Sequence, residues 1–216
     1  PEFTLVEWYR LGFSLEQLMD EVEALVRELL GPGAAARMSE RITYRDAFLR
    51  ELALDPLAAS DADLARAGRA LGYGGGTERD ALLDLLMAAR IGPALGRGAL
   101  TFVHRYPASQ AALAELDPSD ARVALRFELY CDGIELANGF KELRSAAEQR
   151  ARFERDQAER RVRGLPIAGT DERLLAALAA GLPECTGVAL GFDRTVMVAT
   201  GASRIDEVIA FPAERA

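Results

Sequence analysis

Three glutamates recur at intervals of seven residues in the stretch RFELYCDGIELANGFKE. They are Glu128, Glu135 and Glu142, and each has apolar neighbours. An interval of seven would place three charges on one face of a long helix. However, the Asp-Gly and Asn-Gly dipeptides within the stretch favour turns over helices. We therefore interpret the stretch as two strands joined by a tight turn.

A two-residue type I′ turn at the Asp-Gly dipeptide fixes the partners across the two strands. It pairs Tyr130 with Glu135. Further along it pairs Glu128 with Ala137, so that Glu128 and Glu135 become diagonal neighbours on one face. Diagonal positions lie about 7–8 Å apart at Cα, which allows two carboxylates to share one cation. Adjacent carboxylates on a half-buried face repel each other unless a cation lies between them. Because the ligands are oxygen atoms without histidine or cysteine, we expect Mg²⁺.

Glu142 follows the Asn-Gly dipeptide, where a bulge or bend could return it to the face of Glu128 and Glu135. A single carboxylate in a pocket would suit an ammonium group, because a charge removed from water without a partner is costly. The alternative, from geometry alone, is that all three glutamates lie at a rim that faces water. The residues therefore allow two ion-binding carboxylates with one ammonium-binding carboxylate, or three solvated charges.

The elements that would position these glutamates begin with a strand. The first residues, PEFTLVEWYR, alternate as a strand does, with Leu5, Glu7 and Tyr9 on one face. A helix is expected to follow from Ser14, whose capping box opens an apolar stripe that ends at Gly31. This order predicts a strand followed by an amphipathic helix.

Residues 40–98 are rich in alanine and leucine and predict a run of short helices, which we interpret as a helical insertion lying on the sheet domain. Strand patterns return after it, and a long helix rich in arginine and glutamate is expected to begin at Ser145. Near the end, GVALGFDRTVM predicts a strand, a glycine turn and a helix that begins near Arg194. Gly187 and Gly191 would let that strand pass close under a flat ligand.

The composition limits the classes of function. Half of the 216 residues are hydrophobic and 28% are charged, the usual balance of a soluble globular domain. A formal charge of −8 argues against a broad nucleic-acid surface, which needs a basic face. The two cysteines form no disulfide framework or zinc pattern, and no apolar run approaches the roughly 20 residues of a membrane span. Nothing resembles an export signal, so we expect a cytoplasmic protein without membrane contact. His104, the single histidine, is expected to have a structural or surface role.

The motifs PEFTLVEWYR, GIELANGFKEL and GVALGFDR resemble the catalytic domain of class II lysyl-tRNA synthetases. There GVALGFDR corresponds to motif 3 and PEFTLVEWYR to the end of motif 2. The similarity extends over residues 1–216, and within the superfamily the sequence looks most like the stand-alone elongation factor P–(R)-β-lysine ligases. The resemblance implies an α+β fold in which an antiparallel sheet is flanked by helices. It also implies activation of an amino acid with ATP and Mg²⁺, which gives an aminoacyl-adenylate and pyrophosphate.

Carried over by motif position, the resemblance implies a role for each site residue. Glu128 and Glu135 match carboxylates that hold Mg²⁺ on the ATP phosphates. Glu142 and Tyr9 match positions that receive the amino acid, and Glu142 would pair with its side-chain ammonium. The positions that match nucleotide contacts are Glu135, Leu136, Gly191 and Arg194, the last being the motif 3 arginine that clamps ATP during catalysis.

Two differences from the family pattern leave alternatives open. Motif 1, which forms dimer contacts in the family, and the motif 2 arginine before PEFT have no counterpart in this sequence. We expect a fragment of a longer, homodimeric enzyme, with a degenerate, non-catalytic relative as the alternative.

Ala189 bears on the choice of substrate. It stands where lysyl-tRNA synthetases usually have glycine and the ligases have alanine, so it would change the floor of the amino-acid pocket. The expected function is transfer of (R)-β-lysine to a lysine of elongation factor P, without tRNA. The alternative is a lysyl-tRNA synthetase core that uses lysine.

Overall fold

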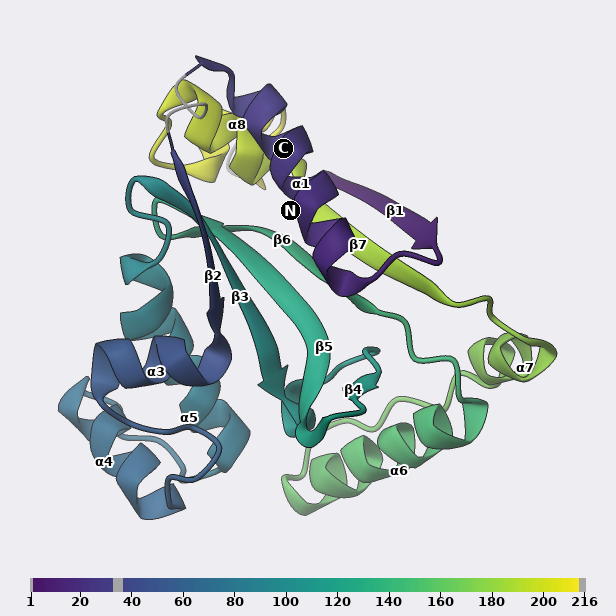
Figure 1. The fold of residues 1–216 in the computed structure, drawn as a ribbon. Coiled ribbons are helices and arrows are strands. Elements are labelled where there is room, and N and C mark those ends of the chain that lie inside the picture. Colours follow the sequence, from purple (N-terminus) through teal and green to yellow (C-terminus); the bar gives the residue numbers. More distant parts are fainter. Residues whose placement is uncertain (1, 33–36, 214–216) are drawn as a thin grey trace.

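One mixed β-sheet organises the molecule, as Figure 1 shows for the computed structural model, which describes residues 2–32 and 37–213. Within these residues seven strands form the sheet in the order β1-β7-β6-β5-β3-β2, and β4 pairs with β5 outside this path. Neighbouring strands are antiparallel except β2 and β3, which are parallel. The strands are β1 (Leu5–Leu11), β2 (Met38–Thr43), β3 (Ala99–Pro107), β4 (Leu116–Asp117), β5 (Asp120–Cys131), β6 (Ile134–Lys141) and β7 (Cys185–Gly191).

Helices flank this sheet, which confirms the expected α+β class. In Figure 1, α3, α4 and α5 gather beside β2 and β3, whereas α6 and α7 lie together beyond the end of β4. The described helices are α1 (Leu15–Leu30), α3 (Tyr44–Leu52), α4 (Asp61–Ala70), α5 (Arg79–Leu86), α6 (Ala146–Val162), α7 (Glu172–Ala180) and α8 (Phe192–Thr200). Among residues 2–32 and 37–213, none of them is long and apolar enough to span a bilayer.

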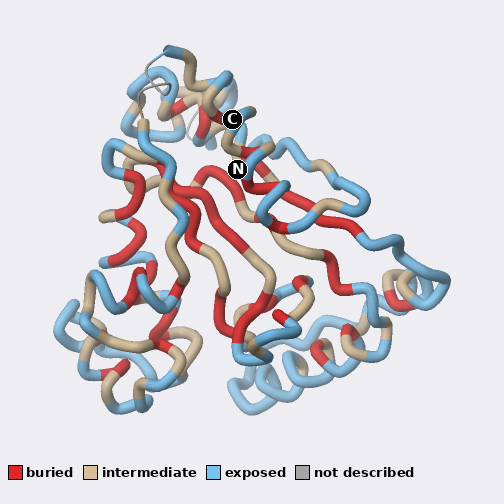
Figure 2. Tube along the Cα trace, in the orientation of Figure 1, coloured by how far each residue is buried: buried red, intermediate tan, exposed pale blue. Residues whose placement is uncertain are grey.

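One face of the sheet, here called the apolar face, packs against α1. The Ser14 hydroxyl accepts a hydrogen bond from Gln17 N, and the Gln17 side chain accepts one from Ser14 N, which confirms the capping box. The helix then buries its apolar stripe, and Figure 2 shows how burial concentrates on the central strands beneath it. The strand residues of this core are Leu100, Phe102, Phe127, Leu129, Cys131, Leu136, Ala137, Val188 and Leu190.

The opposite face, here called the polar face, is built from two rows of paired residues. Residues paired across an antiparallel ladder share a face, so each row can be followed from strand to strand. From β1 to β5, the rows are Glu7–Ala189–Asn138–Glu128 and Tyr9–Gly187–Phe140–Arg126. Segments far apart in sequence therefore supply one continuous surface.

The helical segment covers the β3 side of the polar face. A buried cluster joins residues of α3, α4 and α5 to Val103, Tyr106 and Tyr130 of the sheet. The expected helices over 40–98 begin later than predicted, because residues 40–43 belong to β2 and pair with β3. His104 pairs with Phe127 and so belongs to the apolar side, away from the glutamates.

The β5–β6 hairpin has the turn that its sequence predicts. Asp132 and Gly133 have φ values of 51° and 81°, the positive values that a type I′ turn requires. Tyr130 pairs with Glu135, as expected from that turn. Arg37 donates two hydrogen bonds, at 2.6 and 3.0 Å, to the Asp132 carboxylate and so fixes the turn to the segment before β2.

Beyond the turn the register differs from the prediction, because a β-bulge lies at Leu136. Glu128 pairs with Asn138 and not with Ala137. The bulge was expected after Asn138, but the structure places it two residues earlier. An extra residue reverses the facing of all residues that follow it. Glu142 therefore comes to the same face as the glutamate seven residues before it.

Candidate active site

Glu142 lies directly after β6 in a cavity of about 100 Å³ on the polar face. Its backbone N–H donates to Cys185 O at 3.1 Å, which holds the residue against β7. The residue is only 8% exposed, and no hydrogen bond to its carboxylate is formed by any described residue. Burial raises the pKa of Glu142 to about 7. The side chain is therefore a buried acid that lacks a partner.

Gly187 makes room for the side chains that converge on this cavity. A Cβ at Gly187 would lie 2.3 Å from Glu142 Oε1 and 2.7 Å from Tyr9 Cε1, closer than real contacts allow. Tyr9 is 63% exposed, so its ring stands at the mouth of the cavity. Ala189 also lines the cavity, two residues further along β7. The three residues expected at an amino-acid pocket, Tyr9, Glu142 and Ala189, are thus brought together, with Gly187 between them.

Glu128 is buried to the same degree but has partners of its own. Its Oε1 accepts a hydrogen bond from Arg126 Nη2 at 2.7 Å, and its Oε2 accepts one from Tyr130 Oη at 2.7 Å. Arg126 also donates to Gln110 O at 2.7 Å and lies 4.5 Å from the centre of the Tyr106 ring. These contacts fix the position of both Glu128 oxygen atoms.

Glu135 lies diagonally from Glu128 and is held by Arg194. Arg194 Nη1 donates to Glu135 O at 3.0 Å and lies 3.3 Å from Glu135 Oε2. Burial and then repulsion from Glu128 raise the pKa of the Glu135 carboxyl, and Arg194 opposes the rise. The expected proximity of the two carboxylates is therefore present, despite the change in register.

A cavity of about 510 Å³ extends from Glu135 towards β1 and α8. Gly191 and Arg194 line it, as does the bulged Leu136. The Leu136 residue is only 1% exposed and its side chain belongs to the core on the apolar face, so its backbone faces the cavity. A Cβ at Gly191 would lie 3.6 Å from Leu136 O, an ordinary contact, so sterics within the described chain do not require glycine there.

The donor set of Glu128 and Glu135 fits Mg²⁺ bound together with a phosphate ligand. Both residues offer carboxylate oxygens, the ligand type that Mg²⁺ prefers, and they repel each other without a cation. Across 2–32 and 37–213, no group of three or more histidine, cysteine, aspartate or glutamate side chains could hold a metal. A magnesium ion would therefore take two carboxylates and complete its shell with phosphate and water oxygens.

Arg126, Tyr130 and Asn138 belong to this site, although the sequence did not single them out. Each lies on the polar face because it is two residues from, or paired with, Glu128. Asn138 Oδ1 accepts a hydrogen bond from Arg126 Nε at 3.3 Å, which links the two rows. The alternation of strand residues contained this signal for Arg126 and Tyr130, since positions i−2 and i+2 share the face of residue i, whereas Asn138 reaches this face only because of the bulge at Leu136.

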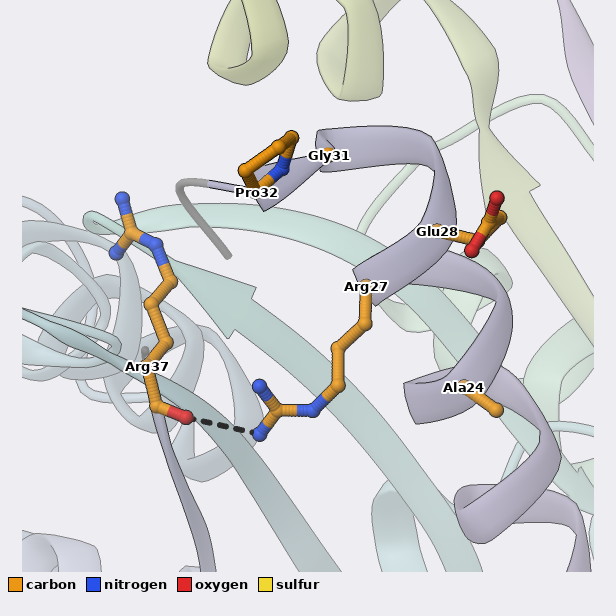
Figure 3. A pocket seen from close by; sticks show the side chains of 6 residues that line it. All are labelled: Ala24, Arg27, Glu28, Gly31, Pro32 and Arg37. Atoms are coloured by element: carbon orange, nitrogen blue, oxygen red, sulfur yellow. Dashed lines mark hydrogen bonds between the residues drawn. The ribbon is translucent and has the colours of Figure 1, made fainter. Parts of the chain in front are cut away.

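A larger cavity, of about 640 Å³, lies elsewhere in the molecule. Figure 3 shows it between the end of α1 and Arg37, with Arg27 donating to Arg37 O at 2.9 Å. None of the residues predicted from sequence lines it. Size alone therefore does not identify the site in this fold.

The sheet flanked by helices, with the cavities beside Glu142 and Glu135 on one face, is consistent with a class II synthetase domain. The sequence model described as tRNA synthetases class II (D, K and N) matches residues 1–215, and the chain belongs to this family. Proteins named elongation factor P–(R)-beta-lysine ligase are similar over the whole chain, with 51% identity in Proteus mirabilis, 50% in Vibrio cholerae and 49% in Pectobacterium carotovorum. The chain spans 66% of the Proteus and Pectobacterium proteins and 67% of the Vibrio protein.

Proposed function

We propose that the protein containing this chain activates (R)-β-lysine with ATP and transfers it to a lysine of elongation factor P. The observation that carries the proposal is the buried carboxylate of Glu142, which has no partner and adjoins a two-carboxylate site on the same sheet face. Substrate and acceptor are suggested by the names of relatives that are 47–51% identical over the whole chain. Membership of a synthetase family supports the ATP-dependent activation.

In this proposal Glu142 binds the side-chain ammonium of the amino acid. A buried ionised carboxylate without a partner is costly, and an ammonium group removes that cost by forming a charge-assisted hydrogen bond. The Tyr9 ring covers the alkyl chain at the mouth of the cavity. Ala189 shapes the floor, where its methyl group would favour the backbone of a β-amino acid over that of an α-amino acid.

The cavity of about 510 Å³ beside Glu135 binds ATP. Arg194 holds the phosphates, while Gly191 and the backbone of Leu136 contact the nucleotide. Glu128 and Glu135 would hold Mg²⁺, which neutralises charge on the phosphates when it is bound. Arg126 and Tyr130 keep Glu128 in position, so its oxygens need little reorganisation when the ligand arrives.

The chemistry is positioning combined with electrostatic stabilisation. A carboxylate oxygen of the amino acid attacks the α-phosphorus of ATP, and the bond from that phosphorus to the bridging oxygen breaks, releasing pyrophosphate. Arg194 stabilises the charge that develops on the phosphates. The acceptor amine then attacks the carbonyl carbon of the adenylate; it loses a proton, and AMP leaves.

The remaining partners follow from the same proposal. We propose a homodimer in the cytoplasm that does not use tRNA as acceptor. The formal charge of −8 supports the last point, since a protein that grips tRNA normally presents a basic face.

ATP–pyrophosphate exchange tests the proposal directly. Exchange should depend on an amino acid and should be faster with (R)-β-lysine than with α-lysine. Equal or faster exchange with α-lysine would indicate a lysyl-tRNA synthetase activity instead. Absence of exchange with both amino acids would indicate a non-catalytic relative. Transfer of labelled (R)-β-lysine to elongation factor P then tests the acceptor.

A further inference from the structure

A third cavity on the polar face has no role in the proposed reaction. It has a volume of about 490 Å³ and lies between the end of α5 and strands β3 and β5, the elements beside β2 in Figure 1. Glu128 forms part of its wall, so the cavity adjoins the two-carboxylate site. Met87, Ala88 and Ala112 give it an apolar portion. A space of this size holds more than one or two ordered waters.

Two tyrosine hydroxyls in this cavity have no hydrogen-bond partner. Tyr44 is 1% exposed and Tyr106 is 3% exposed, and neither hydroxyl forms a hydrogen bond with any described residue. Burial and then the charge of Asp84 raise the pKa of the Tyr44 hydroxyl, and burial and then the charge of Glu128 raise the pKa of the Tyr106 hydroxyl, so carboxylates lie near both groups. The Tyr106 hydroxyl lies close enough to Glu128 to interact with it, so the Tyr44 hydroxyl is the clear orphan. Buried polar groups are normally paired, and this orphan indicates a missing ligand or ordered water.

Two aspartates complete the polar lining. Asp80 Oδ1 accepts a hydrogen bond from Ser109 Oγ at 2.7 Å, and Asp84 Oδ1 accepts one from Gln110 Nε2 at 2.8 Å. Both donors are neutral, and neither aspartate forms an ion pair with a described residue. Burial, followed by repulsion from Asp80, raises the pKa of Asp84. The two carboxylates therefore share a site without a cation.

The charges and geometry of the lining decide the class of ligand. Arg126 is the positive group of the cavity, and Glu128 already neutralises it at 2.7 Å, so Asp80 and Asp84 leave an excess of negative charge. An anion would be repelled. A metal ion held by protein side chains alone is also disfavoured, because no set of three metal-ligating side chains lies within reach in the described chain. An organic cation remains.

We propose that this cavity binds a primary ammonium group on an alkyl chain, at a site distinct from Glu142. An ammonium group has three N–H donors, and Asp84, Asp80 and the Tyr44 hydroxyl supply three acceptors. The apolar portion accommodates the alkyl chain, as the stems of lysine side chains are accommodated on protein surfaces. The ligand is either a free alkylamine or a lysine side chain of a protein. The proposal does not depend on the identity of the substrate at Glu142.

Calorimetric titration with 1,5-diaminopentane tests the site. The titration uses the protein carrying Glu142→Gln, because this change removes the carboxylate proposed to bind an ammonium group in the other cavity. Binding should remain in this variant. Adding Asp84→Asn should weaken it roughly 10- to 100-fold, the usual effect of losing a hydrogen bond to a charged group. Tyr44→Phe removes only a hydroxyl and should weaken it about threefold to tenfold. Asp156→Asn, at an exposed position on α6 that does not line the cavity, is the matched control and should change nothing.

Several results would overturn the proposal. Absence of diamine binding in the Glu142→Gln protein would mean that only water fills the cavity. Unchanged binding after both Asp84→Asn and Tyr44→Phe would place the diamine elsewhere. Binding of one Mg²⁺ that Asp84→Asn abolishes would indicate a metal site. Melting temperatures of all variants show whether a loss of binding arises from unfolding.

A second pair of titrations distinguishes the two sources of the amine. The probes are a short peptide with one lysine and the same peptide with that lysine acetylated. Binding of the unmodified peptide alone supports a protein lysine as the ligand, whereas binding of the diamine alone supports a free alkylamine. Equal binding of both peptides would contradict recognition of an ammonium group.

Discussion

Glu128 and Glu142 are both 8% exposed and lie on the same face of the sheet, but their surroundings differ. Glu128 receives hydrogen bonds from Arg126 and Tyr130, each at 2.7 Å. Glu142 receives none from any residue in 2–32 and 37–213, and burial alone raises its pKa to about 7. Equal burial thus produces one carboxylate that is stabilised within the chain and one that is not.

The difference separates two ways of preparing a binding group. Partners within the chain fix the orientation of Glu128 and lower the cost of removing its charge from water. Glu142 remains half of an ion pair, and the folded chain is destabilised whenever that carboxyl is ionised alone. A ligand that supplies the missing cation recovers this energy, so the residue without partners is the one that selects for charge.

The largest expected effect is the loss of amino-acid binding when Glu142 is changed. Glu142→Gln should weaken binding of (R)-β-lysine by roughly 30- to several thousand-fold, because truncating a buried charge pair typically costs about 2–5 kcal/mol. Binding of ATP with Mg²⁺ should change little, since Glu128, Glu135 and Arg194 remain. Calorimetric titration with each ligand measures both affinities.

Glu154→Gln provides the control for this experiment, because Glu154 is exposed on α6 and does not line the cavity around Glu142. It should leave both affinities unchanged. If Glu142→Gln instead retained the amino acid and lost ATP, Glu142 would belong with the metal ligands. The division into two carboxylates for magnesium and one for an ammonium group would then be wrong.

A second experiment tests the carboxylate pair at Glu135. Glu135→Gln should reduce ATP–pyrophosphate exchange about 100-fold or more, as expected for loss of a charged group that acts on the phosphates. Because the change relieves repulsion with Glu128, the melting temperature without Mg²⁺ should stay the same or rise slightly. Exchange that continues at the normal rate would remove Glu135 from the metal site.

The smallest expected effect is on stability and depends on pH. The pKa of Glu142 is raised from 4.5 to about 7, so the folded state binds this proton more tightly than the unfolded state. The Glu142 contribution should therefore lower the free energy of unfolding as pH rises from about 4.5 to 7, by about 2–4 kcal/mol in total.

Denaturant unfolding of the ligand-free protein at several pH values measures this contribution. In Glu142→Gln the free energy of unfolding should fall less between about pH 4.5 and 7, by the size of the Glu142 contribution. The variant should also be more stable than the wild type above pH 7. A matching change in Glu128→Gln is not expected, because that substitution leaves Arg126 without its carboxylate and should destabilise the protein instead. Parallel pH profiles for the wild type and Glu142→Gln would show that Glu142 is not a buried, unpaired acid.

Local sequence signals predicted several elements of this fold correctly. The Asp-Gly dipeptide predicted the hairpin turn, and the Ser14 capping box predicted the start of α1, because both depend on residues adjacent in the chain. The alternation of side chains along the strand predicted which residues of β1 share a face. Glu128 and Glu135 were placed on one face by the same reasoning, and the structure brings them together.

The errors all concern contacts between segments distant in sequence. Residues 40–43 of β2 were assigned to the helical segment, because the pairing of this strand with β3 depends on residues about 60 positions away. The bulge was expected after Asn138, yet it lies at Leu136, whose side chain is buried in the core beneath α1. The bulge therefore lies where a side chain packs into the core beneath the distant helix α1, and not at the local Asn-Gly dipeptide.

By itself, the sequence determined which side chains are available for chemistry and how the nearest ones alternate along each strand, since φ and ψ preferences and side-chain periodicity are local properties. Only the tertiary structure decided how those side chains are paired. Arg126 and Tyr130 lie within hydrogen-bonding distance of Glu128, whereas no described donor reaches Glu142. The strands β1 and β7, more than 170 residues apart, enclose Glu142 between Tyr9 and Gly187. The burial that changes the pKa of a carboxyl group arises from this packing of distant segments, so it appears only when the chain is folded.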